Sequence, residues 1–246
     1  MAIEFLTAEM QHNLQGTCLF YPCSGNDLVA PITLFAPAIK SFWFADVGYF
    51  PKQGSATIAK PSLDASNGFE LLSAHVRDKL IPESDWMKDP KYRGVEPCTR
   101  TEIYTHLNSG EEITVHRTRR RGPTALRTLA EPLGVFFYRG DSDEGGSGTL
   151  WLTVTRGHNK LFLEVLARLV DRGLIATDGS LCITYSTNRY RAFATVAGRW
   201  DATNTRVRAS SFYDAEHRRF DVLGHVGTHY GRHTLLWQVS GGTPKP

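Results

Sequence analysis

Two segments near the start of the sequence combine residue types and spacing suited to binding a nucleotide. The first is the loop at residues 21–27, Tyr-Pro-Cys-Ser-Gly-Asn-Asp, and the second is Asp46. Gly25 has no side chain to keep a ligand away from the backbone. An acid about twenty residues after such a loop can accept hydrogen bonds from the ribose of a nucleotide that the loop holds. The predicted ligand-binding residues are Tyr21, Pro22, Cys23, Ser24, Gly25, Asn26, Asp27 and Asp46.

A third polar segment, at residues 139–148, is the most glycine-rich and acidic loop of the chain. It directly follows an apolar run at residues 133–138. Arg139 offers a fixed positive charge for an anionic substrate, and Asp141 or Glu144 offers a proton acceptor or a hydrogen-bond partner. The predicted substrate-binding residues are Arg139, Asp141, Glu144 and Ser147. The alternative is that these acids belong to a solvated loop without a ligand.

Several of these residues also have a purely structural interpretation. Asp27 could cap a short helix that comes after it. Asp46 could simply begin a turn toward Gly48. The four cysteines, Cys18, Cys23, Cys98 and Cys182, include no Cys-x-x-Cys pair, so we expect free thiols.

Three histidines recur at a spacing that would align metal ligands on a helix: His225, His229 and His233. Gly227 and Gly231 disfavour a helix there, and no cysteine or acid joins the set. The sequence therefore predicts no metal site.

Residues 116–121, His-Arg-Thr-Arg-Arg-Arg, form the basic cluster of the sequence. A nucleic-acid patch would combine such charges with interleaved aromatic side chains. Trp43, Trp86 and Tyr104 are not interleaved with the cluster along the chain. We therefore interpret it as a solvated hairpin end and expect no nucleic-acid partner, with a nucleic-acid patch as the alternative.

The order of apolar segments predicts alternating helices and strands. Helices are predicted at residues 2–15, 28–35 and 69–80, from Pro123 to before Pro132, and from Leu161 to Gly173. Strands are predicted at residues 17–21, 41–46, 102–107, 112–117, 133–138, 182–185, 220–226 and 235–239. This pattern is typical of an α/β protein with a mostly parallel, doubly wound sheet, here ending in an antiparallel C-terminal hairpin. Ligands of such sheets bind outside the carboxyl ends of the strands, where the predicted binding residues lie.

Residues 17–239 resemble the class I S-adenosylmethionine-dependent methyltransferases, a Rossmann-like superfamily. In that family the loop after the first strand lies against the methionine end of the cofactor, and an acid after the second strand binds its ribose. The loop at residues 21–27 and Asp46 stand at these two positions. Residues 169–179 look like the family's turn from a helix into the fifth strand. The resemblance implies S-adenosylmethionine as cofactor and methyl transfer to a small molecule or another, unidentified acceptor.

The sequence departs from the family pattern in three places. Tyr21 stands where the family has an acid, Gly25 is the single glycine of the loop, and no Asn-Pro-Pro-Tyr comes after residue 138. The last departure argues against amino-directed methylation of nucleic acid or glutamine. The competing hypothesis is a non-catalytic binding or scaffold protein that keeps a Rossmann-like fold with a degenerate cofactor loop.

Composition and charge set the remaining expectations. The chain has 246 residues, of which 41% are hydrophobic, and a formal net charge of +3. We expect one domain over residues 1–240 and a disordered tail at residues 241–246. No apolar run approaches the roughly 20 residues that span a bilayer, and the acids at residues 4 and 9 do not suit a signal peptide. We therefore expect a cytoplasmic protein without a membrane partner.

Overall fold

The computed structural model describes residues 6–46, 61–77, 98–139, 151, 153–154, 161–177, 182–183, 211–213, 217–229 and 232–241. The chain divides into two compact units. The N-terminal unit is Cys18–Ala130, and the C-terminal unit combines Met1–Thr17 with Glu131–Pro246. The single domain expected over residues 1–240 stays a prediction. Residues 242–246 of the expected tail lie outside the described residues.

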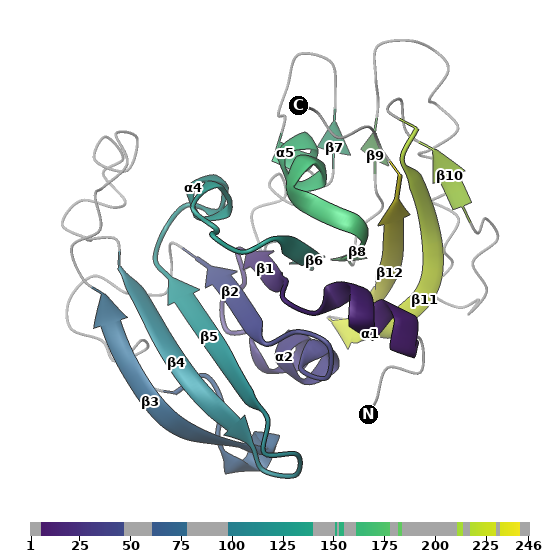
Figure 1. The fold of residues 1–246 in the computed structure, drawn as a ribbon. Coiled ribbons are helices and arrows are strands. Elements are labelled where there is room, and N and C mark those ends of the chain that lie inside the picture. The colour runs from purple at the N-terminus through teal and green to yellow at the C-terminus, as the bar shows by residue number, and fades with distance from the viewer. Residues whose placement is uncertain are drawn as a thin grey trace, which may run out of the picture. The chain divides into compact units, whose positions relative to one another are not determined.

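The N-terminal unit is built on a mixed arrangement of strands (Figure 1). They are β1 (Cys18–Pro22), β2 (Ser41–Ala45), β3 (Phe69–Arg77), β4 (Thr99–His106) and β5 (Glu112–Thr118), in the order β1-β2-β5-β4-β3. β1, β2 and β5 are parallel, whereas β4 is antiparallel to both of its neighbours, β5 and β3. The carboxyl ends of β1, β2 and β5 therefore lie at one edge of the sheet.

Continuous apolar runs make β1 and β2 buried strands. All five residues of β1 are buried, and Phe42 and Phe44 of β2 are fully buried. The short helix α2 (Val29–Phe35) connects the two strands and turns its apolar side chains into the core. The strands predicted at residues 17–21 and 41–46 and the helix predicted at residues 28–35 are confirmed.

The hairpin predicted around residues 108–111 is also confirmed. β4 and β5 pair antiparallel from Thr99 opposite Thr118 to Thr105 opposite Glu112. β5 pairs with β2 on its other side, so it is the third strand of the parallel set. The helix predicted from Pro123 is α4 (Gly122–Arg127), and this proline lies in its first turn.

The helix predicted at residues 69–80 is wrong, because this segment begins with β3. A capped turn does precede β3, but it is only the single 3-10 turn η1 (Ala65–Asn67). The Asp64 side chain caps it by accepting hydrogen bonds from N–H groups of the turn. Gly68, at φ 85°, then ends the turn, and β3 pairs with β4 along its length. A bulge at Leu72 interrupts that pairing. Pairing with β4 thus outweighs the helical spacing of the apolar residues.

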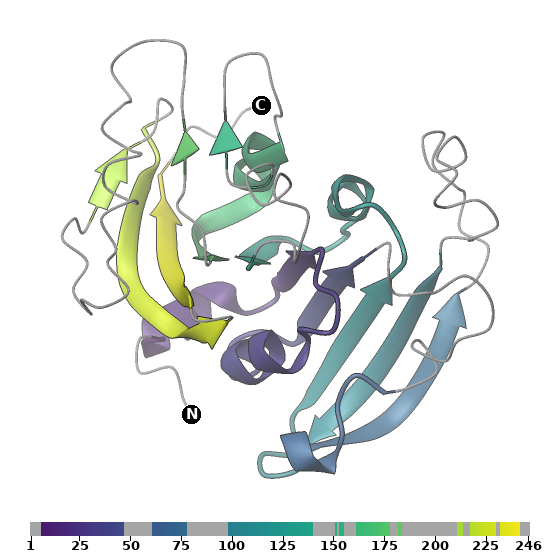
Figure 2. The ribbon, with the colours of Figure 1, turned by 180° about the vertical axis from the view of Figure 1, so that it is seen from behind.

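The C-terminal unit contains a second set of strands (Figure 2). They are β6 (Leu133–Tyr138), β8 (Leu169–Thr177), β12 (Arg232–Ser240), β11 (Arg219–His229) and β10 (Ser211–Tyr213), in that order. β6 and β8 are parallel, and the three remaining pairings are antiparallel. β7 (Thr153–Val154) and β9 (Cys182–Ile183) form a separate parallel pair. The strand at residues 133–138 and the C-terminal antiparallel pair agree with the sequence-based expectation.

Among the described residues of the C-terminal unit there are two helices, and both are shorter than predicted. α1 (Ala8–Leu14) begins at the Thr7 cap, whose hydroxyl accepts the N–H of Met10. α5 (Leu161–Arg168) passes directly into β8 without a loop. Gly173, the predicted helix end, lies inside β8. The register between β6 and β8 is irregular just before Gly173, where Arg172 has a left-handed φ of 59°.

The prediction of an α/β fold with a mostly parallel, doubly wound, Rossmann-like sheet is wrong. The part of the chain that the structure describes is mostly β, with mixed strand directions and few, short helices. Two segments account for the difference: the β3 region was expected to be a helix, and residues 169–177 extend a strand where the helix was expected to continue. The helices that remain are too few to cover both faces of a doubly wound sheet.

Within the C-terminal unit, the side chain of Thr17, three residues after α1, packs very closely against Gly134 of β6. The Thr17 hydroxyl donates to the carbonyl of Leu14 at 2.7 Å and is buried. A Cβ atom at Gly134 of β6 would lie 1.9 Å from Thr17 Oγ1 and 2.7 Å from Thr17 Cβ. Only glycine fits at this position, because Cβ contacts under about 3 Å do not occur in real structures.

Candidate functional site

The predicted loop begins directly at the end of β1 and turns sharply away from the sheet. Its first residue beyond the strand, Cys23, still donates its N–H to the Ala45 carbonyl of β2 at 2.6 Å. Cys23 and Gly25 then adopt left-handed backbone angles, with φ 57° and 49°. Such a conformation is costly for cysteine but not for glycine. The loop is therefore held in a defined, partly strained shape.

The second predicted segment contacts the first. The Gly25 N–H donates to Asp46 Oδ2 at 2.8 Å, although the two residues are far apart in the sequence. The Asp46 N–H donates to the Thr118 carbonyl at the end of β5, at 3.1 Å. Asp46 thus joins the loop after β1 to the ends of β2 and β5. The contact agrees with the positions that the spacing argument gave the loop and the acid, after neighbouring parallel strands. That the two hold one nucleotide stays a prediction.

Asp27 does not cap α2, so the structural alternative for this residue is wrong. The helix has Leu28 at its N-cap position and no side-chain capping bond. Asp27 Oδ2 instead accepts the Tyr21 hydroxyl at 3.0 Å. This bond closes the loop at its base, since Tyr21 is buried at the end of β1.

The loop and Asp46 differ in how accessible they are. Tyr21, Pro22 and Ser24 are buried and serve as the framework of the loop. The residues that remain partly or fully exposed are Cys23, Gly25, Asn26, Asp27 and Asp46. A ligand at this edge of the sheet would therefore meet these five residues of the eight predicted.

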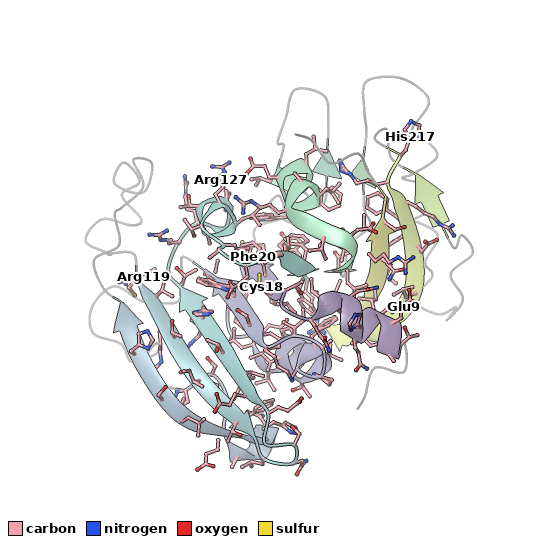
Figure 3. All side chains as sticks on the ribbon, in the orientation of Figure 1. Glu9, Cys18, Phe20, Arg119, Arg127 and His217 are labelled. Atoms are coloured by element: carbon pink, nitrogen blue, oxygen red, sulfur yellow. The ribbon has the colours of Figure 1, made fainter. Side chains whose placement is uncertain are left out.

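A third segment lies at the same edge, although the sequence analysis assigned it to a solvated hairpin end. Residues 119–121, Arg-Arg-Arg, come directly after β5, and Figure 3 shows Arg119 at the carboxyl end of that strand. The Arg119 N–H donates to the Cys98 carbonyl at 2.8 Å. The sequence predicts the hairpin but not the parallel pairing of β5 with β2. Because β5 pairs with β2, the three arginines that follow β5 lie at the same edge of the sheet as Asp46.

The predicted substrate loop is described only at its first residue. Arg139 Nε donates to Thr234 Oγ1 at 2.9 Å, and the guanidinium lies 5.0 Å from the ring centre of Phe137. Both contacts are within the C-terminal unit. Asp141, Glu144 and Ser147 lie outside the described residues. Their substrate-binding role therefore stays a prediction.

A buried charged cluster on β4 and β5 was also missed. Glu102 is fully buried, and one of its oxygens accepts Arg100 Nε at 2.8 Å and Arg117 Nη2 at 3.1 Å. Its other oxygen accepts the N–H of Ser62 at 3.2 Å and also bonds to the Ser62 hydroxyl. These contacts provide hydrogen-bond donors for both oxygens of the buried carboxylate. They also hold the chain at residue 62 against β4. We interpret the cluster as structural.

The Tyr104 hydroxyl also holds this part of the chain against β4, because it accepts hydrogen bonds from the N–H groups of Ser62 and Leu63, at 2.7 and 3.2 Å. Burial raises the pKa of Tyr104 above its usual value, and the negative charge of Glu102 raises it further. The folded state therefore favours the neutral phenol. Stability from this group is complete below the ordinary tyrosine pKa, about 10, and is lost as the pH rises above it.

The direction of this pKa shift gives a pH test of the hydrogen bonds that Tyr104 accepts from residues 62 and 63. Between about pH 9 and pH 11, the free energy of unfolding should fall more steeply for the wild-type protein than for Tyr104→Phe. Urea unfolding at several pH values measures both slopes, and the comparison cancels the other tyrosines. Tyr104→Phe should also be less stable at neutral pH, because it removes an acceptor shared by two backbone N–H groups. Identical slopes would show that the phenol does not titrate differently on unfolding.

Among the described residues there is no cluster of three or more histidine, cysteine or acidic side chains that could hold a metal ion. His225 and His229 lie on β11 and His233 on β12, so the three histidines are on strands and not on a helix. No helix in the described part of the chain has the length and apolarity needed to cross a membrane. The cysteines Cys18, Cys23 and Cys98 are free thiols, as expected.

No family model, curated protein or solved structure matches this chain.

Proposed function

We propose that the loop at residues 21–27 and Asp46 bind S-adenosylmethionine and that the protein is a methyltransferase with an unidentified acceptor. The observation that carries this proposal is the hydrogen bond from the Gly25 N–H to Asp46 Oδ2, at 2.8 Å. It supports a preorganised site, because a glycine loop and an acid from neighbouring parallel strands already lie in contact.

The chemistry of these residues fits the adenosine part of the cofactor. A carboxylate has two oxygens with about four acceptor positions, so Asp46 can accept a ribose hydroxyl while it keeps its bond to Gly25. Of the atoms that the structure describes, Asp46 Oδ2 would lie nearest to a Cβ at Gly25, at 4.0 Å, so these atoms leave room for a ligand beside the glycine. The exposed Asn26 and the partly exposed Asp27 offer further polar groups at the same loop.

Methyl transfer from S-adenosylmethionine requires few catalytic groups from the protein. When bound, S-adenosylmethionine supplies an electrophilic methyl group on a sulfonium. The protein has to hold the acceptor in line with that group, and at most one general base is needed. The loop and Asp46 would fix the cofactor end of this geometry. This explains why the sequence needs no catalytic triad.

Isothermal titration calorimetry with S-adenosylmethionine and with S-adenosylhomocysteine tests the proposal. We expect dissociation constants from micromolar to sub-millimolar for both compounds. No binding at millimolar concentration would contradict the proposal and favour the alternative, a non-catalytic binding or scaffold protein. The alternative has its own support, since the loop has one glycine and Asp46 already satisfies a backbone N–H of the chain.

The variant Asp46→Asn separates ligand binding from loop support. Asparagine keeps an oxygen that can accept the Gly25 N–H, but it loses the charge that strengthens a bond to ribose. We expect affinity for both compounds to fall by about 1–3 kcal/mol, the usual value of a hydrogen bond to a charged group. The control is Glu70→Gln, which neutralises an exposed acid on β3 of the same unit. Equal affinity in Asp46→Asn and wild type would assign Asp46 to the loop alone.

A further inference from the structure

Three strands of the N-terminal unit, β2, β4 and β5, have one buried face and one partly exposed face. Along β2, β4 and β5 the buried side chains alternate with partly exposed ones, which is the pattern of a sheet packed on one side only. The buried face includes Phe42, Phe44, Val115 and Tyr104. The partly exposed face, here called the open face, includes Trp43, Thr101, Thr114 and His116.

A continuous row of side chains crosses the open face. Trp43 of β2 pairs with His116 of β5, His116 with Thr101 of β4, and Thr101 with His75 of β3. The rings of Trp43 and His116 are stacked, with centroids 3.9 Å apart and an angle of 18° between the planes. Thr101 Oγ1 lies 3.0 Å from His116 Nδ1 and fixes the orientation of the imidazole. The open face therefore presents a rigid aromatic pair.

Charge is distributed unevenly along this face. Residues 119–121, Arg-Arg-Arg, begin three residues after His116, which is about 10 Å along a strand. Figure 3 shows Arg119 at this end and Arg127 on the nearby helix α4. The acids Glu70 and Glu112 lie at the opposite end, where both pair with Thr105. Among these described charges, those beyond the carboxyl end of β5 favour an anion, whereas those at the opposite end disfavour it.

Along the sequence, the basic run and the nearest tryptophan before it that the structure describes, Trp43, are separated by more than 70 residues. The pairing of β2 with β5 removes that separation, because it puts Trp43 directly beside His116. The aromatic residue that the sequence analysis found missing from the basic cluster is thus supplied by a neighbouring strand. The expectation that residues 116–121 are a solvated hairpin end is wrong for residues 116–118, which belong to β5, because Arg117 and Thr118 are buried.

We propose that the open face binds single-stranded nucleic acid. An unpaired base would extend the Trp43–His116 stack, and the phosphates next to it would lie against Arg119–Arg121. Stacking is open to any base and arginine contacts any phosphate, so this surface favours single strands with little sequence preference. A duplex fits less well, because its bases are already stacked on one another. The proposal does not depend on cofactor binding.

Fluorescence anisotropy of a labelled single strand of about 10 nucleotides measures this binding directly. RNA and DNA of the same sequence are titrated separately, together with the corresponding duplex. We expect micromolar affinity for at least one single strand, and weaker binding of the duplex. Contacts to three phosphates predict that log K falls with log salt concentration with a slope of about −2.

Paired variants separate charge from stacking. Arg119→Gln, Arg120→Gln and Arg121→Gln combined should weaken binding at least tenfold and flatten the salt slope, whereas the three lysine replacements should largely restore both. Trp43→Leu should weaken binding about tenfold without changing the slope, and Trp43→Phe should weaken it less. The control Lys40→Gln removes an exposed charge outside the arginine run.

Three results would overturn the proposal. The first is the absence of single-strand binding by folded wild-type protein at low salt. The second is equal affinity of the wild type and the arginine-to-glutamine variant, with circular dichroism showing both folded. The third is tighter binding of the duplex than of the single strand, with Trp43→Leu unchanged. The last result would assign the arginines to a duplex backbone and leave no role for the aromatic pair.

Discussion

Glu102→Ala is expected to lower the free energy of unfolding by about 3–5 kcal/mol, the usual cost of removing one partner from a buried ion pair. The change takes the carboxylate away from the guanidinium groups of Arg100 and Arg117, whose side chains are largely buried. It also removes the acceptor for the N–H and hydroxyl of Ser62. Urea unfolding followed by circular dichroism measures the loss.

The matched control for this prediction is Glu112→Ala, which removes an exposed acid from the adjacent strand β5. Its effect should stay within about 0.5 kcal/mol, as for most surface substitutions. Glu102→Gln should fall between the two, because the amide keeps one acceptor but not the charge. A loss below about 1 kcal/mol in Glu102→Ala would mean that the two arginines find other partners.

Gly134→Ala is expected to lower the free energy of unfolding by about 3 kcal/mol, the upper end of the usual cost of overpacking. The added methyl carbon would overlap Thr17, whose hydroxyl is only 1.9 Å from the Cβ position. Thr17 cannot rotate away without giving up its buried bond to the Leu14 carbonyl. Thermal and urea unfolding both measure this effect.

A double-mutant cycle tests the stated cause. Thr17→Gly removes both atoms that the new methyl carbon would overlap, so Gly134→Ala should cost much less in that background. The single variant Thr17→Gly supplies the reference for the lost hydrogen bond. If the two changes are simply additive, the overlap with Thr17 does not explain the instability of Gly134→Ala.

The elements that the sequence predicted correctly are those with a strong local signal. β1, β2 and β6 are continuous apolar runs, and α2 and α4 have proline and turn residues at their ends. β3 was missed because Phe69, Leu72 and Val76 happen to have helical spacing. Its strand conformation comes from pairing with β4, which is not visible in the segment itself. The entry into β8 was misplaced for a similar reason, since β8 pairs on both sides.

The candidate site also contains features that could be predicted from the sequence and features that depend on strand pairing. The loop at residues 21–27 and Asp46 could be predicted together, because the spacing of a parallel pair of strands is regular. The contact between Trp43 and His116 could not, because it depends on the register of β2 against β5. Glu102 was missed because nothing in an alternating strand distinguishes a buried carboxylate from a solvated one. Its partners come from residues 62 and 117.

The bulge at Leu72 affects whether the edge of β3 can pair with strands of other copies of the protein. Among the described residues β3 pairs only with β4, and Leu71, Leu72 and Val76 are exposed on it. A flat strand with such side chains would be a template for the strands of other copies, the first step of aggregation. The bulge breaks the regular spacing of the strand at its most apolar point. The bulge therefore protects the folded protein against edge-to-edge self-association.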